Sequence, residues 1–99
     1  MSKHTPGPWF VTGNMTLYVE ARIGGGLVQE VAAVGPTEAD SGYGPQQRAN
    51  ADLIAAAPDL LDALESAEMA LLGYTHKNEI TLSALYKARA AIAKARGDA

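Results

Sequence analysis

The feature that most constrains the fold is a proline inside the most hydrophobic helical stretch of the chain, residues 48–65. Pro58 lacks an amide hydrogen and clashes with the preceding turn, so it kinks or ends a helix. Proline is also favoured at the first position of a helix, and two acids follow it within one turn. The sequence therefore predicts one helix over about 46–57 and a second from 58 to about 72, with Gly73 as its terminator.

A third helix is predicted over 82–96, with Thr81 as its N-cap and Gly97 at its end. The second helix is acidic and the third is basic, so an antiparallel hairpin of the two would set opposite charges side by side. The charged residues concerned are Asp59, Asp62, Glu65, Glu68, Lys87, Arg89, Lys94 and Arg96.

The first third of the chain has the alternating pattern of half-buried strands. Residues 16–23 place Leu17, Val19, Ala21 and Ile23 on one face and polar side chains on the other. A short β-prone run precedes them at 9–12, and a returning strand is expected at 27–34, after the three glycines at 24–26. The predicted fold class is α+β: an N-terminal three-stranded antiparallel β-meander followed by two or three C-terminal helices that form a helical hairpin.

The length of 99 residues fits a single domain over 1–99. Its expected parts are an extended lead at 1–8, the sheet at 9–34, a loop at 35–45 and helices at 46–97. Nineteen of the apolar residues are alanine, which buries little area, so the core is thin. A homo-oligomer is therefore expected.

Composition excludes several classes of protein. The chain has no cysteine, so it has no disulfide framework and no thiolate metal site. No apolar run is long enough for a membrane span, and the N-terminus lacks the apolar core of a signal peptide. The net charge of −3 argues against broad binding to nucleic acid. We expect a cytoplasmic protein.

No pattern predicts catalysis. His4 and His76 are far apart in sequence, and neither has a partner at metal-ligand spacing, so no metal site and no cofactor is expected. Asp59 and Asp62 have acid–base chemistry open to them, but acids in the first turn of a helix are also favoured by its dipole. The glycines at 24–26 are followed by a strand pattern and read as a hairpin turn rather than a phosphate-binding loop.

The strongest candidate for ligand binding is the start of the first predicted helix. A helix N-terminus attracts anions, and Arg48 beside it can hold phosphate oxygens with two donors. Gln47 and Asn50 can read the edge of a base or a ribose, and Tyr43 can stack on a planar ring. The alternative is an ordinary polar helix start with an exposed tyrosine. Trp9 has two interpretations as well, either as an anchor in the core or as a second stacking residue.

The chain resembles a widespread group of small phage and prophage proteins. The blocks that carry the resemblance are His-Thr-Pro-Gly-Pro-Trp at 4–9 and Ala-Asn-Ala-Asp-Leu-Ile-Ala-Ala-Ala-Pro-Asp-Leu-Leu-Asp-Ala-Leu at 49–64. The basic, alanine-rich segment 87–94 fits the same group. The resemblance implies a phage origin and a location in the cytoplasm of the host bacterium.

More remotely, the chain is similar to the phage anti-defence sponges that counter Thoeris immunity. That resemblance implies a homo-oligomer that sequesters a cyclic ADP-ribose type signal, or a cyclic oligonucleotide, without cleaving it. The leading hypothesis is such a non-enzymatic sponge. The alternative is an accessory protein that docks on and inhibits a host defence or regulatory protein through the alanine-rich face of the first helix. An enzyme is the third hypothesis.

Overall fold

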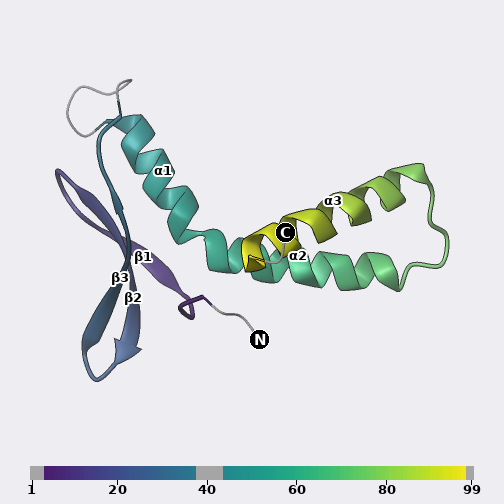
Figure 1. Cartoon of the computed structure of the whole chain (residues 1–99), viewed down its shortest axis with the longest axis horizontal. Helices are drawn as coiled ribbons and strands as arrows, with labels where there is room; N and C mark the ends of the chain where they lie inside the picture. Colours follow the sequence, from purple (N-terminus) through teal and green to yellow (C-terminus); the bar gives the residue numbers. More distant parts are fainter. Residues whose placement is uncertain (1–3, 38–43, 98–99) are drawn as a thin grey trace. The chain divides into compact units, whose positions relative to one another are not determined.

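The computed structural model describes residues 4–37 and 44–97 and shows three strands followed by three helices (Figure 1). The predicted α+β fold, a β-meander followed by a helical hairpin, is confirmed. The elements are β1 (Trp9–Gly13), β2 (Leu17–Gly24), β3 (Leu27–Val34), α1 (Pro45–Ala55), α2 (Ala57–Leu72) and α3 (Glu79–Arg96).

The residues divide into two compact units. The first, which we call the sheet unit, is Thr5–Asp59 and contains the three strands and α1. The second, the hairpin unit, comprises His4 and the residues from Leu60 onward, and it contains most of α2 and all of α3. The single domain over 1–99 stays a prediction.

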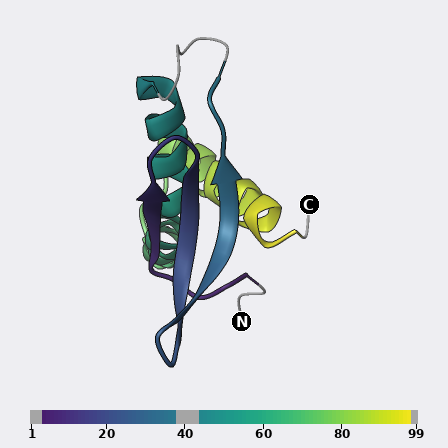
Figure 2. The same cartoon turned by 90° about the vertical axis from the view of Figure 1, so that its left-hand side faces the viewer.

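The sheet unit has two layers, a sheet in the order β1-β2-β3 and one helix that packs on it (Figure 2). Both strand pairs are antiparallel, so side chains of paired residues share a face. The face toward α1 contributes Leu17, Val19 and Val34 to a buried cluster with Ala51 of α1. The core of this unit thus lies between α1 and one side of the sheet.

The strand prediction is wrong in one detail. Ile23 was expected on the buried face with Leu17, Val19 and Ala21, but its side chain is 53% exposed. The pairing of β2 with β3 is irregular between Arg22 and Gly24. Such a bulge lets a residue leave the alternation, and Ile23 then turns away from the core.

The turn that joins β2 to β3 is as predicted. Gly25 and Gly26 have φ angles of 61° and 75°, and positive φ at both central positions is the requirement of a two-residue hairpin turn of type I′. Glycine meets this requirement without the strain that a β-carbon would bring.

Pro58 separates two helices, although not at the predicted position. α1 ends at Ala55 and α2 begins at Ala57, so the proline occupies the second residue of α2 rather than the first. A proline at this position costs no hydrogen bond, because the first amides of a helix have no partner within it. The side chain of Pro58 is buried.

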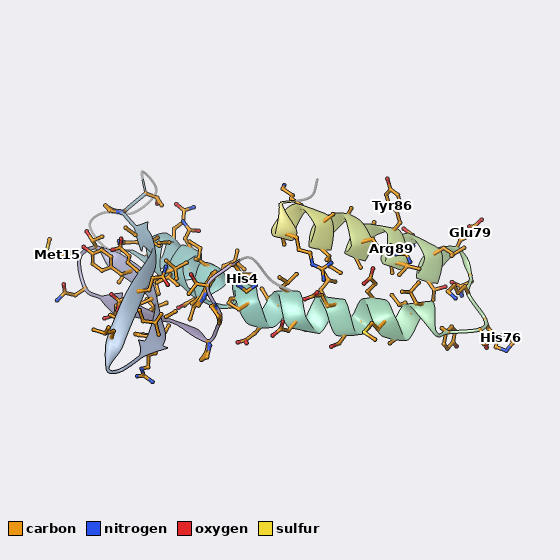
Figure 3. All side chains as sticks on the ribbon, turned by 60° about the horizontal axis from the view of Figure 1, so that its bottom comes forward. His4, Met15, His76, Glu79, Tyr86 and Arg89 are labelled. Carbon is orange, nitrogen blue, oxygen red and sulfur yellow. The ribbon has the colours of Figure 1, made fainter. Side chains whose placement is uncertain are left out.

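In the hairpin unit, α2 and α3 are joined by ion pairs of the predicted signs. Arg89 pairs with Glu68 at 3.3 Å, and Arg96 pairs with Glu65. In Figure 3, Tyr86 points away from α2.

The N-cap prediction for α3 is wrong, because Asn78 is the N-cap and Thr81 is the third helical residue of a capping box. Asn78 starts the helix earlier since its side chain accepts from the amide of Thr81 at 3.0 Å.

Candidate binding surfaces

Gln47 lies inside the sheet unit. It is in the first turn of α1, is fully buried, and its Nε2 donates to the carbonyl oxygens of Val34 at 2.8 Å and Met15 at 3.0 Å. These bonds tie α1 to the end of β3 and to the loop between β1 and β2. The side-chain nitrogen is thereby engaged within the fold.

Trp9 also faces the core of the sheet unit. Its ring packs against the buried cluster formed by the sheet and α1, and its Nε1 donates to the carbonyl oxygen of Thr5 at 3.1 Å. Of the two interpretations of this residue, the position in the fold favours the core anchor. The indole nitrogen has a partner four residues earlier, as buried tryptophans usually require.

Arg48 and Asn50 are exposed, but they do not share a side of α1. Two residues correspond to a rotation of about 200° around a helix, so their side chains leave opposite flanks. Arg48 forms an ion pair with Asp52 at 3.1 Å on the surface. Tyr43 lies outside the residues that the structure describes. The described part of the predicted site therefore consists of Arg48 and Asn50 facing apart, with Gln47 beneath them.

The start of α1 keeps one property of an anion site. Its N-cap is Gly44, which has no side chain to cap the helix, and no acidic residue lies in the first turn. Arg48 is the first residue whose amide closes a helical hydrogen bond, to Gly44 at 3.2 Å. Its exposed guanidinium lies beside the positive end of the helix dipole.

A different surface of the same unit gathers more of the residue types found in binding sites. It is the face of the sheet opposite α1, which we call the open sheet face. Within the sheet unit, α1 packs on the sheet and covers the other side. The open sheet face contains Phe10, Thr12, Tyr18, Glu20, Arg22, Val28 and Glu30.

Aromatic rings and a cation meet on the open sheet face. The guanidinium of Arg22 lies 5.2 Å from the centre of the Phe10 ring, a separation at which cation–π attraction operates. A recess of about 160 Å³ beside it is lined by Arg22, Leu27 and Val28 with two glycines of the turn. Sequence reasoning assigned Tyr18, Glu20 and Arg22 to the polar face of the strand. It missed that a single helix layer leaves that face open.

The hairpin unit exposes large apolar side chains. Its buried residues are Leu61, Leu85, Ala88 and Ile92. Its exposed large residues are Leu60, Met69, Leu72, Tyr74, Ile80, Leu82 and Tyr86, with Ile80 79% exposed. A shallow recess near the start of α3 is lined by Ile80, Ala84 and Lys87, among others. More large apolar residues face solvent than face the interior.

The described residues contain no group of three or more His, Asp or Glu side chains placed to hold a metal ion. None of their helices has the length and apolar character needed to cross a bilayer.

Comparison with known proteins identifies a family. No curated protein and no solved structure matches the chain. The family model described as Salmonella phage P22 protein Y8K6 matches residues 1–99, which is the whole sequence. The predicted resemblance to small phage proteins is confirmed at this level: the chain belongs to the family of the Salmonella phage P22 protein Y8K6.

Proposed function

We propose that this protein is a non-enzymatic phage accessory protein that docks on a host defence or regulatory protein through the open sheet face. The observation that carries the proposal is the contact of the half-buried Phe10 ring with the exposed Arg22, flanked by Tyr18 and Val28 on neighbouring strands. Aromatic residues and arginine are enriched in protein interfaces and dominate their binding energy. Glu20 and Glu30 add polar groups to this face, as is typical of interfaces between proteins that are also soluble when they are apart.

The proposed docking surface differs from the one expected from sequence. The alanine-rich face of the first helix was the expected surface, but Ala51 is fully buried and Ala55 half-buried against the sheet. Small residues do allow close approach here, and the element that approaches is the chain's own sheet. The open sheet face has no such partner among the described elements of its unit.

The test is capture of host proteins by the purified protein and two charge-reversal variants. Arg22→Glu alters the open sheet face, while Lys94→Glu makes the same charge change on an exposed residue of α3. We expect Arg22→Glu to weaken capture of a specific host protein at least about 30-fold, the usual effect at an interface hot spot. Lys94→Glu should retain it. Equal capture by both variants would place the binding surface elsewhere.

A second candidate function is the sequestration of a cyclic nucleotide immune signal without cleavage. It is favoured by the exposed guanidinium of Arg48 beside a helix start that has a glycine N-cap and no acid in its first turn. The ion pair with Asp52 is worth only about 0.3–0.5 kcal/mol, so a phosphate could displace it. The remote similarity to the Thoeris anti-defence sponges suggests cyclic ADP-ribose isomers or cyclic oligonucleotides as ligands.

Isothermal titration separates the two functions. The probes are cyclic ADP-ribose isomers and cyclic di- and trinucleotides. A sponge should bind one of them with a Kd below about 10 μM, corresponding to roughly 7 kcal/mol. Arg48→Ala should abolish that binding and Arg22→Ala should preserve it. If no probe binds at this affinity, the sponge is excluded and the docking proposal is untouched.

A further inference from the structure

We propose that the hairpin unit pairs with a second copy of itself to form a four-helix bundle, through one apolar face. This face, which we call the hairpin face, combines a stripe on α2 with a stripe on α3. The α2 stripe is Leu60, Leu64, Ala67 and Leu71, and the α3 stripe is Ala84, Ala88, Ala91 and Ala95. The proposal does not rest on the docking function, which uses another surface.

Both stripes have the spacing of helices that pack along their length. The residues follow one another at intervals of four, three and four, the repeat of a coiled-coil seam. None of the eight positions carries a charge or a hydrogen-bonding side chain. Five of the eight are exposed within one copy, Leu64 and Leu71 are half-buried, and Ala88 alone is buried.

Helical geometry places the two stripes on the same side of the hairpin. Around the axis of α2, the stripe is rotated by about 90° from the side that carries Leu61 and Glu68, which face α3. Around the axis of α3, the stripe is rotated by about 90°, in the same sense along the chain, from the side that carries Leu85 and Ile92, which face α2. Because the helices are antiparallel, an equal offset in the same rotational sense brings both stripes to one face.

One copy of the hairpin unit lacks the packing that a stable domain requires. Its large buried side chains are Leu61, Leu85 and Ile92. A unit of well under 70 residues rarely has a core that suffices alone, and a disulfide, a metal or association usually supplements it. The chain has no cysteine, and the described residues contain no group of side chains placed to hold a metal ion, so association is the means that is left.

The charges of the two helices and the sizes of the side chains in the two stripes favour a second copy of the hairpin unit as the partner. α2 carries four acids and no base, while α3 carries four bases and one acid, so the net charges are −4 and +3. A two-fold axis parallel to the helices sets α2 of one copy antiparallel to α3 of the other. This arrangement pairs opposite charges twice, whereas α2 against α2 would oppose like charges. It also packs leucines against alanines, so large and small residues alternate across the interface.

The first test is the oligomeric state of the full chain by analytical ultracentrifugation. The wild type is expected to sediment as a dimer of its 10.3 kDa chain. Ala91→Glu puts a charge on the hairpin face, and Ala90→Glu is a matched control because Ala90 is exposed on another side of the same helix. We expect Ala91→Glu to raise the dimer Kd at least about 100-fold with helix content preserved by circular dichroism. Ala90→Glu should remain dimeric.

A monomeric wild type at about 100 μM, a dimeric Ala91→Glu, or equal dissociation of both variants would overturn the proposal.

The second test fixes the orientation of the copies through disulfide formation. The chain has no cysteine of its own, and Ala67 and Ala91 are both exposed. Mixing Ala67→Cys with Ala91→Cys under mild oxidation should give a cross-linked heterodimer, since the proposed axis puts these positions next to each other. Ala67→Cys alone should cross-link at least about tenfold more slowly, because α2 does not face α2. Faster cross-linking of Ala67→Cys with itself, or none in the mixture, contradicts the arrangement.

Discussion

A β-carbon placed on Gly7 would lie 2.9 Å from the β-carbon of Pro58, closer than such atoms ever approach. The proline that separates α1 from α2 therefore also packs against the segment that leads into β1. Its ring is buried, and the backbone of Gly7 passes directly against it. The sequence shows both residues, but only the fold shows that each requires the other.

Gly7→Ala should destabilise the sheet unit by about 1–3 kcal/mol, the usual cost of an added methyl in a packed site. The control is Gly35→Ala, because a β-carbon at Gly35 meets no atom within 4 Å. Urea unfolding followed by Trp9 fluorescence measures both. Equal stability of the two variants would mean that the segment before β1 moves away from Pro58 at little cost.

Gln47→Ala should lower the free energy of unfolding by about 2–4 kcal/mol, because two carbonyl oxygens lose their donor and a cavity is left. The bonds concerned run to Val34 and Met15. Asn50→Ala, on an exposed position of the same helix, should change stability by less than about 0.5 kcal/mol. Urea titration checks both values. A loss below about 1 kcal/mol at Gln47 would show that water replaces the amide.

Gln47→Glu should make stability depend on pH. Burial raises the pKa of a carboxyl group, and the ionised form has no proton to donate to the carbonyl oxygens of Val34 and Met15. With the folded-state pKa above the unfolded value, stability is largest below the unfolded pKa and falls as pH rises through the folded one. Thermal unfolding of this variant should give a higher Tm near pH 4 than near pH 7.5, after subtraction of the wild-type difference. An unchanged difference would contradict the burial of residue 47.

Asn78→Ala should destabilise the hairpin unit by about 0.5–2 kcal/mol, the usual cost of losing an N-cap. The side chain of Asn78 accepts from the Thr81 amide, while the Thr81 hydroxyl accepts from the Asn78 amide at 2.8 Å. Asn78→Ser keeps a capping oxygen and should recover most of the loss. Helix content by circular dichroism during heating measures the difference. If serine recovered nothing, the capping box would not govern the start of α3.

The fold was largely predictable because two simple periodicities specify it. Alternation predicted β2, and the glycines predicted the turn after it, since both depend on local geometry alone. Ile23 could not be placed, because a bulge depends on how β3 pairs with β2. The N-cap of α3 was misplaced for a related reason. Asn78 and Thr81 both favour helix starts, and their reciprocal bonds decide the matter.

The candidate site was harder to predict than the fold. Glutamine and tryptophan serve ligands and cores with the same atoms, and the sequence does not say that Gln47 is directed at backbone carbonyl oxygens. The separation of Arg48 from Asn50 follows from helical rotation and could have been foreseen. To predict the open sheet face, one has to know how many helices pack on the sheet. One amphipathic helix cannot cover both sides of a sheet.

The hydrogen bonds of the buried Gln47 amide depend on the correct register of the sheet. Its Nε2 can donate both hydrogen bonds only if the carbonyl oxygens of Val34, the last residue of β3, and of Met15, in the loop before β2, lie next to each other. A slip of β3 by one residue would turn the Val34 carbonyl away and bring a different group there. α1 can therefore complete its docking only on correctly paired strands. A single side chain thus links the order of the strands to the formation of the first helix.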